Sequence, residues 1–409
     1  MDKTIQKPPR KIKLFATLKN GVITGSANND PAGIATFAQI GVLTGYGLIW
    51  LLILVTPLVI ALEEMSGRIG IVTRTGLNKL IRRTYGTFLA KTVAIVLIVC
   101  NIATIGANIA AMSEIIGDFT KLHWGILVPI ILTIITAWLV ISSYTTISKY
   151  LLWMSVVMLL YLLALFAIDI NPQQIAHDLW PVQLSNTSGF AVAAVALIGA
   201  VIAPSLLFWQ TTEEVEEKRL LRDIPREHIS IKIGFLYSSI ISLAIIILAA
   251  TIFTSNTVIT SAGQMAQLLR PLIGSWAFIL FAIGMIVSGL LNIPILAAST
   301  AYAVAESLNL PAGLSKKIRA AKGFYSVLIG TLAISGLIMF TNISPMLMLF
   351  YTQALNGLLL PILIITIMMI ANNSSIMGRH RNSRLSNLLG VISLIIILGF
   401  DTLLLTKLL

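Results

Sequence analysis

The residues best able to do chemistry in this sequence lie in NDPAG at residues 29–33, inside an otherwise apolar stretch. A carboxylate at the depth of a bilayer costs at least about 2.5 kcal/mol on insertion scales, so Asp30 is expected to be functional. Pro31 removes a backbone donor and leaves carbonyl groups free. A carboxylate beside free carbonyl groups favours a cation as ligand. The alternative is that Asp30 only caps the helix that follows, and the two roles are compatible.

A second interruption lies in GAVIAPS at residues 199–205, where Pro204 falls inside another apolar stretch. A lone proline of this kind is most often a simple kink. Here the two prolines occupy corresponding positions five spans apart, so two repeats of five spans would have opposite orientations in the membrane. Paired interruptions in inverted repeats indicate the midplane site of a transporter. We therefore expect broken helices at Pro31 and Pro204 with a cation site between them.

The composition places these segments in a membrane. Charged residues make up 11% of the chain and hydrophobic residues 57%, whereas soluble domains carry about 25% charged residues. The sequence predicts an all-α integral membrane protein with one membrane-embedded domain over residues 1–409, inverted repeats at about 17–170 and 189–371, and an extra helix at about 386–406. Eleven stretches have the length and apolar character of transmembrane helices: 17–40, 45–66, 89–116, 124–142, 150–169, 189–210, 232–254, 273–304, 323–341, 345–371 and 386–406.

The net charge of +12 reflects topology rather than nucleic-acid binding. With a cytoplasmic N-terminus, all but three of the 28 Lys and Arg residues fall on the cytoplasmic side, as the positive-inside rule requires. The exceptions are Lys121, Arg270 and Lys407. We expect a multi-pass cell-membrane protein, surrounded by lipid, with its C-terminus outside. No nucleophile–base pair or metal-ligand cluster lies inside the spans, so neither an enzyme nor a resident cofactor is expected. The sequence gives no indication of oligomeric state.

These motifs resemble those of the NRAMP family of divalent-metal transporters, which has eleven or twelve spans and a LeuT-like fold. The resemblance covers essentially the whole chain and is carried by NDPAG, RIGIVTRTGL at 68–77, GAVIAPS, and TQALNGLLLP at 352–361. It implies that Asp30 binds the metal ion and that Gln353 approaches it. It also implies that the backbone carbonyl groups of Ala27 and Ala200 are ligands.

The sequence departs from the family pattern at several ligand positions. Gly33 replaces the metal-binding Asn, Ala203 replaces the Met whose thioether contacts soft metals, and Ser205 replaces a His. Hard oxygen ligands suit Mg²⁺ and Mn²⁺, and Mg²⁺ usually keeps several of its waters. One carboxylate, small residues at 33 and 203, and the carboxamides of Gln353 and Asn356 fit that habit. The chain therefore resembles the NRAMP-related magnesium transporters, with Mn²⁺ as an additional cargo.

The third predicted span also departs from the pattern. NRAMP transporters that co-transport protons carry acidic residues where this sequence has Asn101, Asn108 and Ala111. Neither amide takes up and releases a proton near neutral pH, so the sequence predicts uptake that is not coupled to protons. The alternative for the two asparagines is hydrogen bonding between helices.

Three other functions remain open. A proton-coupled Mn²⁺/Fe²⁺ transporter of the main NRAMP type is disfavoured by Gly33, Ala203 and Ser205. An amino-acid or amine transporter of the same fold is disfavoured by Asp30 and by the absence of a glycine-rich break in the first span. An ion channel is disfavoured by the two broken helices, since these are typical of alternating-access transporters.

Overall fold

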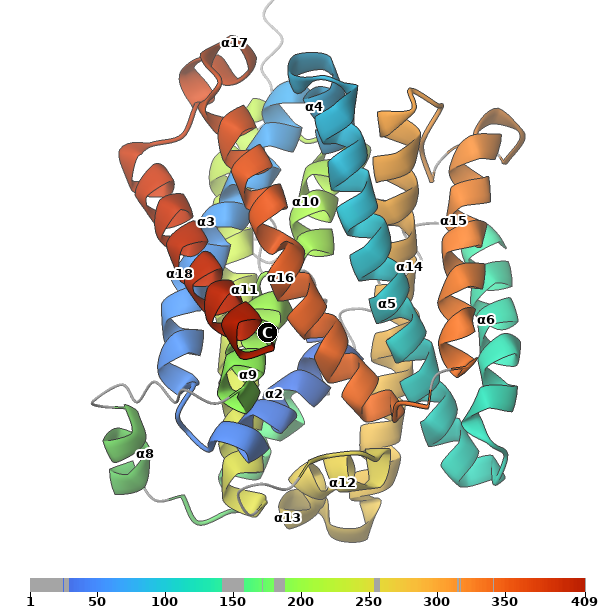
Figure 1. Ribbon diagram of the computed structural model, residues 1–409, viewed down its shortest axis with the longest axis vertical. Coiled ribbons are helices and arrows are strands. Elements are labelled where there is room, and N and C mark those ends of the chain that lie inside the picture. The colour runs from blue at the N-terminus through green and yellow to red at the C-terminus, as the bar shows by residue number, and fades with distance from the viewer. Residues whose placement is uncertain are drawn as a thin grey trace, which may run out of the picture.

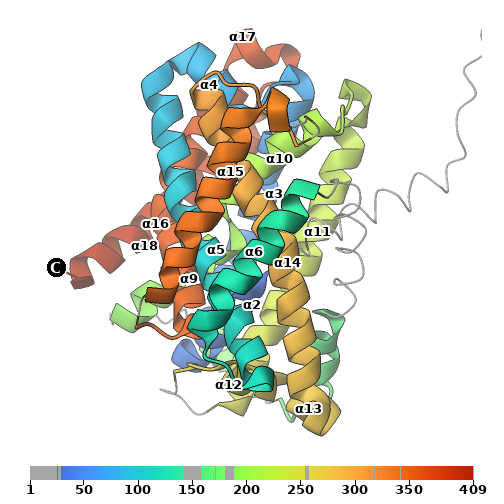
Figure 2. The ribbon, with the colours of Figure 1, turned by 90° about the vertical axis from the view of Figure 1, so that its right-hand side faces the viewer.

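The computed structural model describes residues 25, 29–141, 158–170, 172–179, 188–253, 258–314, 316, 318–340 and 342–408. Over these residues all regular elements are helices, most of them aligned along one long axis (Figures 1 and 2). The helices that matter below are α2 (Pro31–Thr44), α3 (Ile49–Thr73), α4 (Leu77–Tyr85), α5 (Thr87–Thr120), α6 (Trp124–Ile141), α9 (Ser188–Val201), α10 (Pro204–Glu216), α11 (Ile224–Ile252), α12 (Ala262–Ala266), α13 (Arg270–Ile273), α14 (Ala277–Ser307), α15 (Lys322–Ser335), α16 (Pro345–Asn372), α17 (Ser374–Met377) and α18 (Arg384–Leu408).

The two ends of the molecule are easily told apart. Figure 1 shows α4 and α17 at one end and the short helices α12 and α13 at the other. We call these the α4 end and the α12 end. Most of the basic residues that the sequence analysis assigned to the cytoplasm belong to segments at the α4 end, including those of α4 itself and of the turn after α17.

Within the part of the chain that the structure describes, seven helical stretches are long and apolar enough to cross a membrane. They are Ile49–Thr73, Thr87–Thr120, Gly189–Glu216, Leu221–Ile252, Ala262–Ser307, Pro345–Asn372 and Arg384–Lys407. Three further apolar helices are shorter, namely Pro31–Thr44, Trp124–Ala137 and Lys322–Ser335. The all-helical prediction is therefore confirmed. The count of eleven spans and the two inverted repeats stay predictions, because parts of the first and fifth predicted spans lie outside the described residues.

Helix breaks occur beside both prolines. α2 begins at Pro31, and α9 ends at Val201 before α10 begins at Pro204. Proline suits the first position of a helix because its missing N–H would have no intrahelical partner there, and its fixed φ matches the helix. The break predicted in the sixth span is thus confirmed, and each proline starts a new helix rather than kinking a continuous one.

The helices pack in two groups. In the first group, α2 lies against α9 and α11, and α10 lies against α3. In the second group, α14 lies against α5 and α15, and α4 lies against α5. Helix α16 contacts both groups, through α9 and α5. Where α16 crosses α9 the two backbones are in close contact. A Cβ on Gly199 would lie 2.0 Å from the carbonyl oxygen of Gln353.

Residues 77–85 form α4, a helix that the apolar pattern does not predict. Its first turn is held by a side chain from α14: the Glu306 carboxylate accepts hydrogen bonds from the backbone N–H groups of Asn78 and Lys79, both at 3.1 Å. Gly76 leaves room for this contact, because a Cβ there would lie 1.7 Å from that carboxylate and would displace it. Glu306 therefore joins α4 to the second group.

Candidate metal site

Asp30 lies at the start of α2 and is 6% exposed. One carboxylate oxygen, Oδ1, accepts a hydrogen bond of 2.7 Å from the Gly33 N–H, so the side chain caps the helix as the alternative interpretation predicted. The other oxygen, Oδ2, accepts a hydrogen bond from Nδ2 of Asn292. A carboxylate has about four lone-pair positions. Two hydrogen bonds therefore leave room for Asp30 to bind a cation.

Asn292 is a site residue that the sequence analysis missed. It lies in α14, 262 residues from Asp30 in sequence, and is 6% exposed. The available signal was a single amide two residues before Pro294 inside a long apolar stretch. Such an amide alone does not reveal its partner. The contact brings α14 of the second group to the start of α2 in the first.

Asn108 of α5 lies beside the same carboxylate and is fully buried. Its NH₂ group is the part that can interact with the Asp30 carboxylate. Its Oδ1 atom has no hydrogen-bond partner in the part of the chain that the structure describes. Buried polar groups are rarely left unpaired, because the loss costs about 1–3 kcal/mol. An unpaired amide oxygen next to a buried carboxylate is therefore a sign that a polar ligand or a bound water belongs here.

The break between α9 and α10 supplies backbone oxygens. Pro204 has no N–H, so the carbonyl of Ala200 lacks the donor that a continuous helix would provide. The Ile202 N–H donates to the Ile198 carbonyl at 2.8 Å. The Ala203 carbonyl accepts the first backbone hydrogen bonds of α10. Ser205, which follows Pro204, is 4% exposed. Its hydroxyl has replaced an imidazole in the family pattern, so this corner of the site is small and neutral.

Helix α16 brings two carboxamides towards this break. Nδ2 of Asn356 donates to Oε1 of Gln353 at 2.7 Å, so the oxygen predicted to approach the ion is already engaged. Oδ1 of Asn356 is buried and has no partner among the described residues. The two side chains are held near Ala200 because Gly199 packs directly against the backbone of Gln353 and Gly357. Asn356 thus offers the freer oxygen of the pair.

The other predicted positions separate into different roles. Asn101 donates through Nδ2 to the Leu296 carbonyl, at 3.0 Å, and to the hydroxyls of Ser299 and Thr300, both at 2.9 Å. It therefore joins α5 to α14, as the hydrogen-bonding alternative predicted. Ala111 is fully buried in the apolar core. Ala27 lies outside the described residues, so the prediction for its carbonyl is untested.

Among the residues that the structure describes, no three His, Cys, Asp or Glu side chains are arranged to hold a metal ion. The candidate site is instead one carboxylate, Asp30, with the amides of Asn108 and Asn292 beside it. The Gln353–Asn356 pair of α16 lies where α16 packs against the end of α9, near Ala200. This donor set consists of oxygens and matches the preference of hard cations.

Residues 21–407 match the model of the natural resistance-associated macrophage protein-like family. The chain belongs to the Nramp family. With its long apolar helices, this Nramp protein is a multi-pass membrane protein.

Several relatives carry the name divalent metal cation transporter MntH. The protein of Acidiphilium cryptum is 23% identical over 94% of this chain and 89% of its own length. The protein of Deinococcus radiodurans is 23% identical over 98% of this chain and 92% of its own length. These relatives thus align with nearly the full length of the Nramp chain.

Solved structures support the same fold. A manganese transporter of Eremococcus coleocola, solved as a mutant, superposes with a TM-score of 0.76 at 17% identity, covering 97% of this chain and 88% of that one. Mhp1, a nucleobase–cation symporter, superposes with a TM-score of 0.61 at 13% identity, covering 96% and 92% of the two chains. The prediction of a LeuT-like fold is thereby confirmed.

Proposed function

We propose that this Nramp protein carries Mg²⁺, and also Mn²⁺, across the cell membrane by alternating access. Transport proceeds without proton co-transport, and the protein is not an enzyme. The observation that carries this proposal is the buried Asp30 carboxylate, bonded to Asn292 and flanked by Asn108, whose amide oxygen has no partner among the described residues. A single negative charge among neutral polar groups suits a cation, whereas an anion would be repelled by the Asp30 carboxylate.

The choice of Mg²⁺ rests on hydration. Mg²⁺ dehydrates reluctantly and is usually held by one or two carboxylates with several waters retained. Metal-bound waters are hydrogen-bond donors and need acceptors around them. The buried, unpaired Oδ1 atoms of Asn108 and Asn356 are acceptors of this kind. The small residues Gly33 and Ala203 leave space for the waters, whereas a thioether at 203 would favour soft metals.

In this proposal the α4 end faces the cytoplasm, because the positive-inside rule assigns the basic residues of that end there. The N-terminus is then cytoplasmic and the C-terminus outside. The eleven predicted spans form two inverted repeats, and one group of helices rocks about Asp30 to expose the site to either side.

Mn²⁺ as the main cargo is the second candidate, since the relatives and solved neighbours are named as divalent-metal and manganese transporters. Reconstituted protein separates the two. Uptake of Mg²⁺ into liposomes should saturate, should compete with Mn²⁺, and should resist Cd²⁺ and cationic amines. Absence of saturable Mg²⁺ uptake with robust Mn²⁺ uptake would overturn the magnesium assignment. Inhibition by amines would favour the amine-transporter alternative.

A further inference from the structure

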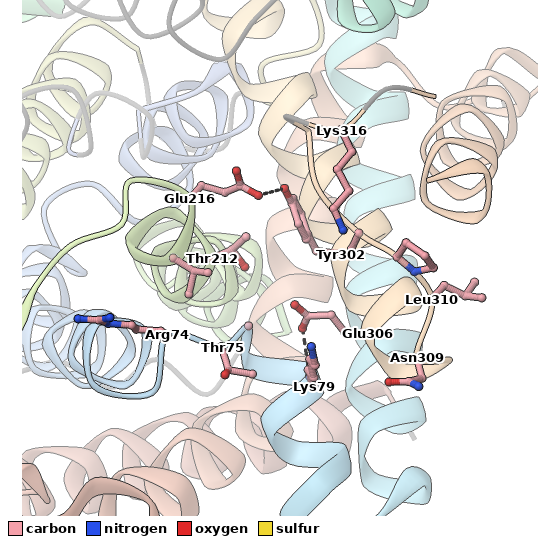
Figure 3. A pocket seen from close by; sticks show the side chains of 14 residues that line it. Arg74, Thr75, Lys79, Thr212, Glu216, Tyr302, Glu306, Asn309, Leu310 and Lys316 are labelled. Carbon is pink, nitrogen blue, oxygen red and sulfur yellow. Dashed lines mark hydrogen bonds between the residues drawn. The ribbon is translucent and has the colours of Figure 1, made fainter. Parts of the chain in front are cut away.

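A pocket of about 450 Å³ opens at the α4 end, between α4, α10 and α14 (Figure 3). Its walls include Thr212 and Glu216 of α10, Tyr302 and Glu306 of α14, Lys79 of α4, and Lys316 from the segment before α15. Along α14, Tyr302 follows Asn292 by ten residues, which is about 15 Å of helix. Helices α10 and α14 thus both run from the candidate metal site to this pocket. The pocket therefore lies where a path from that site would open at the α4 end.

The hydroxyl of Tyr302 joins three segments at this mouth. It donates to Oε1 of Glu216 at 2.6 Å, and it accepts a hydrogen bond of 2.9 Å from the backbone N–H of Leu314. Figure 3 shows the Tyr302 and Glu216 side chains pointing towards one another across the pocket. Glu216 belongs to the first helix group and Tyr302 to the second. This hydrogen bond therefore ties the two groups together at the α4 end.

The ring of Tyr302 also fills the space on the side of the metal site. It packs edge-on against Trp209 of α10, with ring centroids 6.4 Å apart, and against Phe324 of α15, at 4.8 Å. Trp209 is 6% exposed and Tyr302 is 4% exposed. Trp209 follows Pro204 by five residues, so along α10 this ring lies between the helix break and Glu216 at the pocket. The two buried rings are thus placed to close a route between the break and the pocket.

We propose that Tyr302 is the latch of the gate at the α4 end. Its bond to Glu216 holds α10 against α14, and its release lets α10 move away so that the site opens into the pocket. The proposal rests on the alternating access proposed above, but it does not depend on which ion is carried. A hydrogen bond to a charged acceptor corresponds to about ten- to hundredfold in an equilibrium constant. Loss of the hydroxyl should therefore shift the population strongly towards the open gate.

The test is Tyr302→Phe, which keeps the ring and removes the hydroxyl. A matched control is Tyr325→Phe in α15, because the Tyr325 hydroxyl bonds to the Lys316 carbonyl at 2.9 Å, in the same connecting segment, without reaching α10. The reporter is a cysteine introduced by Ser205→Cys in a chain whose only cysteine has been removed by Cys100→Ala. A membrane-impermeant thiol reagent is applied to one face of vesicles at a time.

With Tyr302→Phe we expect modification from the α4 side to become about tenfold faster and modification from the α12 side to become slower. With Tyr325→Phe we expect neither change. Equal rates in the two variants would overturn the latch, as would a change of the same sign from both sides, which indicates general loosening. Glu216→Ala removes the acceptor from the other side and should give the same shift. If Tyr302→Phe does not fold, the accessibility measured with Glu216→Ala tests the latch instead. A shift in accessibility in a protein that takes up no Mg²⁺ would support the proposed role of Tyr302 and refute Mg²⁺ as the transported ion.

Discussion

Replacing Asp30 by Asn tests the candidate site most directly. Asn is as good a helix cap as Asp, so it can keep the bond to the Gly33 N–H that now measures 2.7 Å. The side-chain NH₂ of the new residue then faces the Nδ2 donor of Asn292. A rotation of the Asn292 amide presents its oxygen instead and restores a hydrogen bond. The variant should therefore fold and melt close to the unmodified protein.

The loss of charge, in contrast, should abolish binding of the ion. Two unit charges 4 Å apart interact by about 4 kcal/mol at an effective dielectric constant of 20, so a divalent ion at that distance gains about 8 kcal/mol from the carboxylate. Where desolvation offsets half of this, about 4 kcal/mol remains, which is about a thousandfold in Kd. Among the described residues no group of three His, Cys, Asp or Glu side chains is arranged to hold the ion in place of Asp30.

The assay is a calorimetric titration of the purified protein with Mn²⁺ and Mg²⁺, together with uptake into proteoliposomes. Asp118→Asn is the matched control, because Asp118 is an exposed carboxylate near the α12 end of α5. We expect no measurable heat and background uptake with Asp30→Asn, and ordinary binding with Asp118→Asn. If Asp30→Asn folds normally and binds Mn²⁺ within about tenfold of the unmodified protein, the ion does not bind at Asp30 and the site is wrong.

The combined variant Gly33→Asn, Ala203→Met should strengthen Cd²⁺ inhibition of Mg²⁺ uptake at least tenfold by restoring a thioether and an amide; unchanged inhibition would show that these positions do not set selectivity. Gly199→Ala should lower the free energy of unfolding by about 1–3 kcal/mol, since its Cβ would lie 2.0 Å from the Gln353 carbonyl oxygen. Gly189→Ala in the same helix meets open space and should not destabilise; thermal melting compares the two, and equal midpoints would refute the packing argument. A pH-sensitive dye sealed in proteoliposomes should report no acidification beyond empty liposomes while Mg²⁺ or Mn²⁺ enters at negative internal potential. Acidification in proportion to uptake would restore the proton-coupled alternative.

The helix breaks could be predicted because their cause is local. Proline has no N–H to donate within a helix, whatever surrounds it. Pro31 and Pro204 therefore mark helix starts from sequence alone. The capping role of Asp30 is also local, as it needs only the N–H of Gly33 three residues later. A carboxylate before a proline in an apolar stretch was therefore enough to locate the centre of the candidate site.

The partners of Asp30 could not be predicted in the same way. Asn292 reaches Asp30 only because α14 passes the start of α2. An isolated amide in an apolar helix gives no sequence pattern from which its partner could be predicted. The engagement of Gln353 by Asn356 was missed for a different reason. Residues three apart share a helix face and can bond to each other, and the family pattern at Gln353 does not include the amide of Asn356 that occupies its oxygen here. Helix α4 was missed because it is too short and too polar to resemble a transmembrane span, although its own apolar face, Leu77, Leu80 and Ile81, is buried.

The two asparagines of α5 illustrate why the proposed transport has no need of protons. The NH₂ group of Asn101 is fully engaged by α14, so this side chain holds two helices together. The Oδ1 atom of Asn108 has no partner among the described residues, and beside Asp30 it can accept a hydrogen bond from a metal-bound water. A carboxylate at 108 would repel Asp30 and one of the two would tend to hold a proton; an amide recognises the water without that consequence. Each charge that moves through 100 mV releases about 2.3 kcal/mol, so a divalent ion gains about 4–5 kcal/mol. That energy supports about a thousandfold inward gradient, which makes the membrane potential a sufficient driving force for this site.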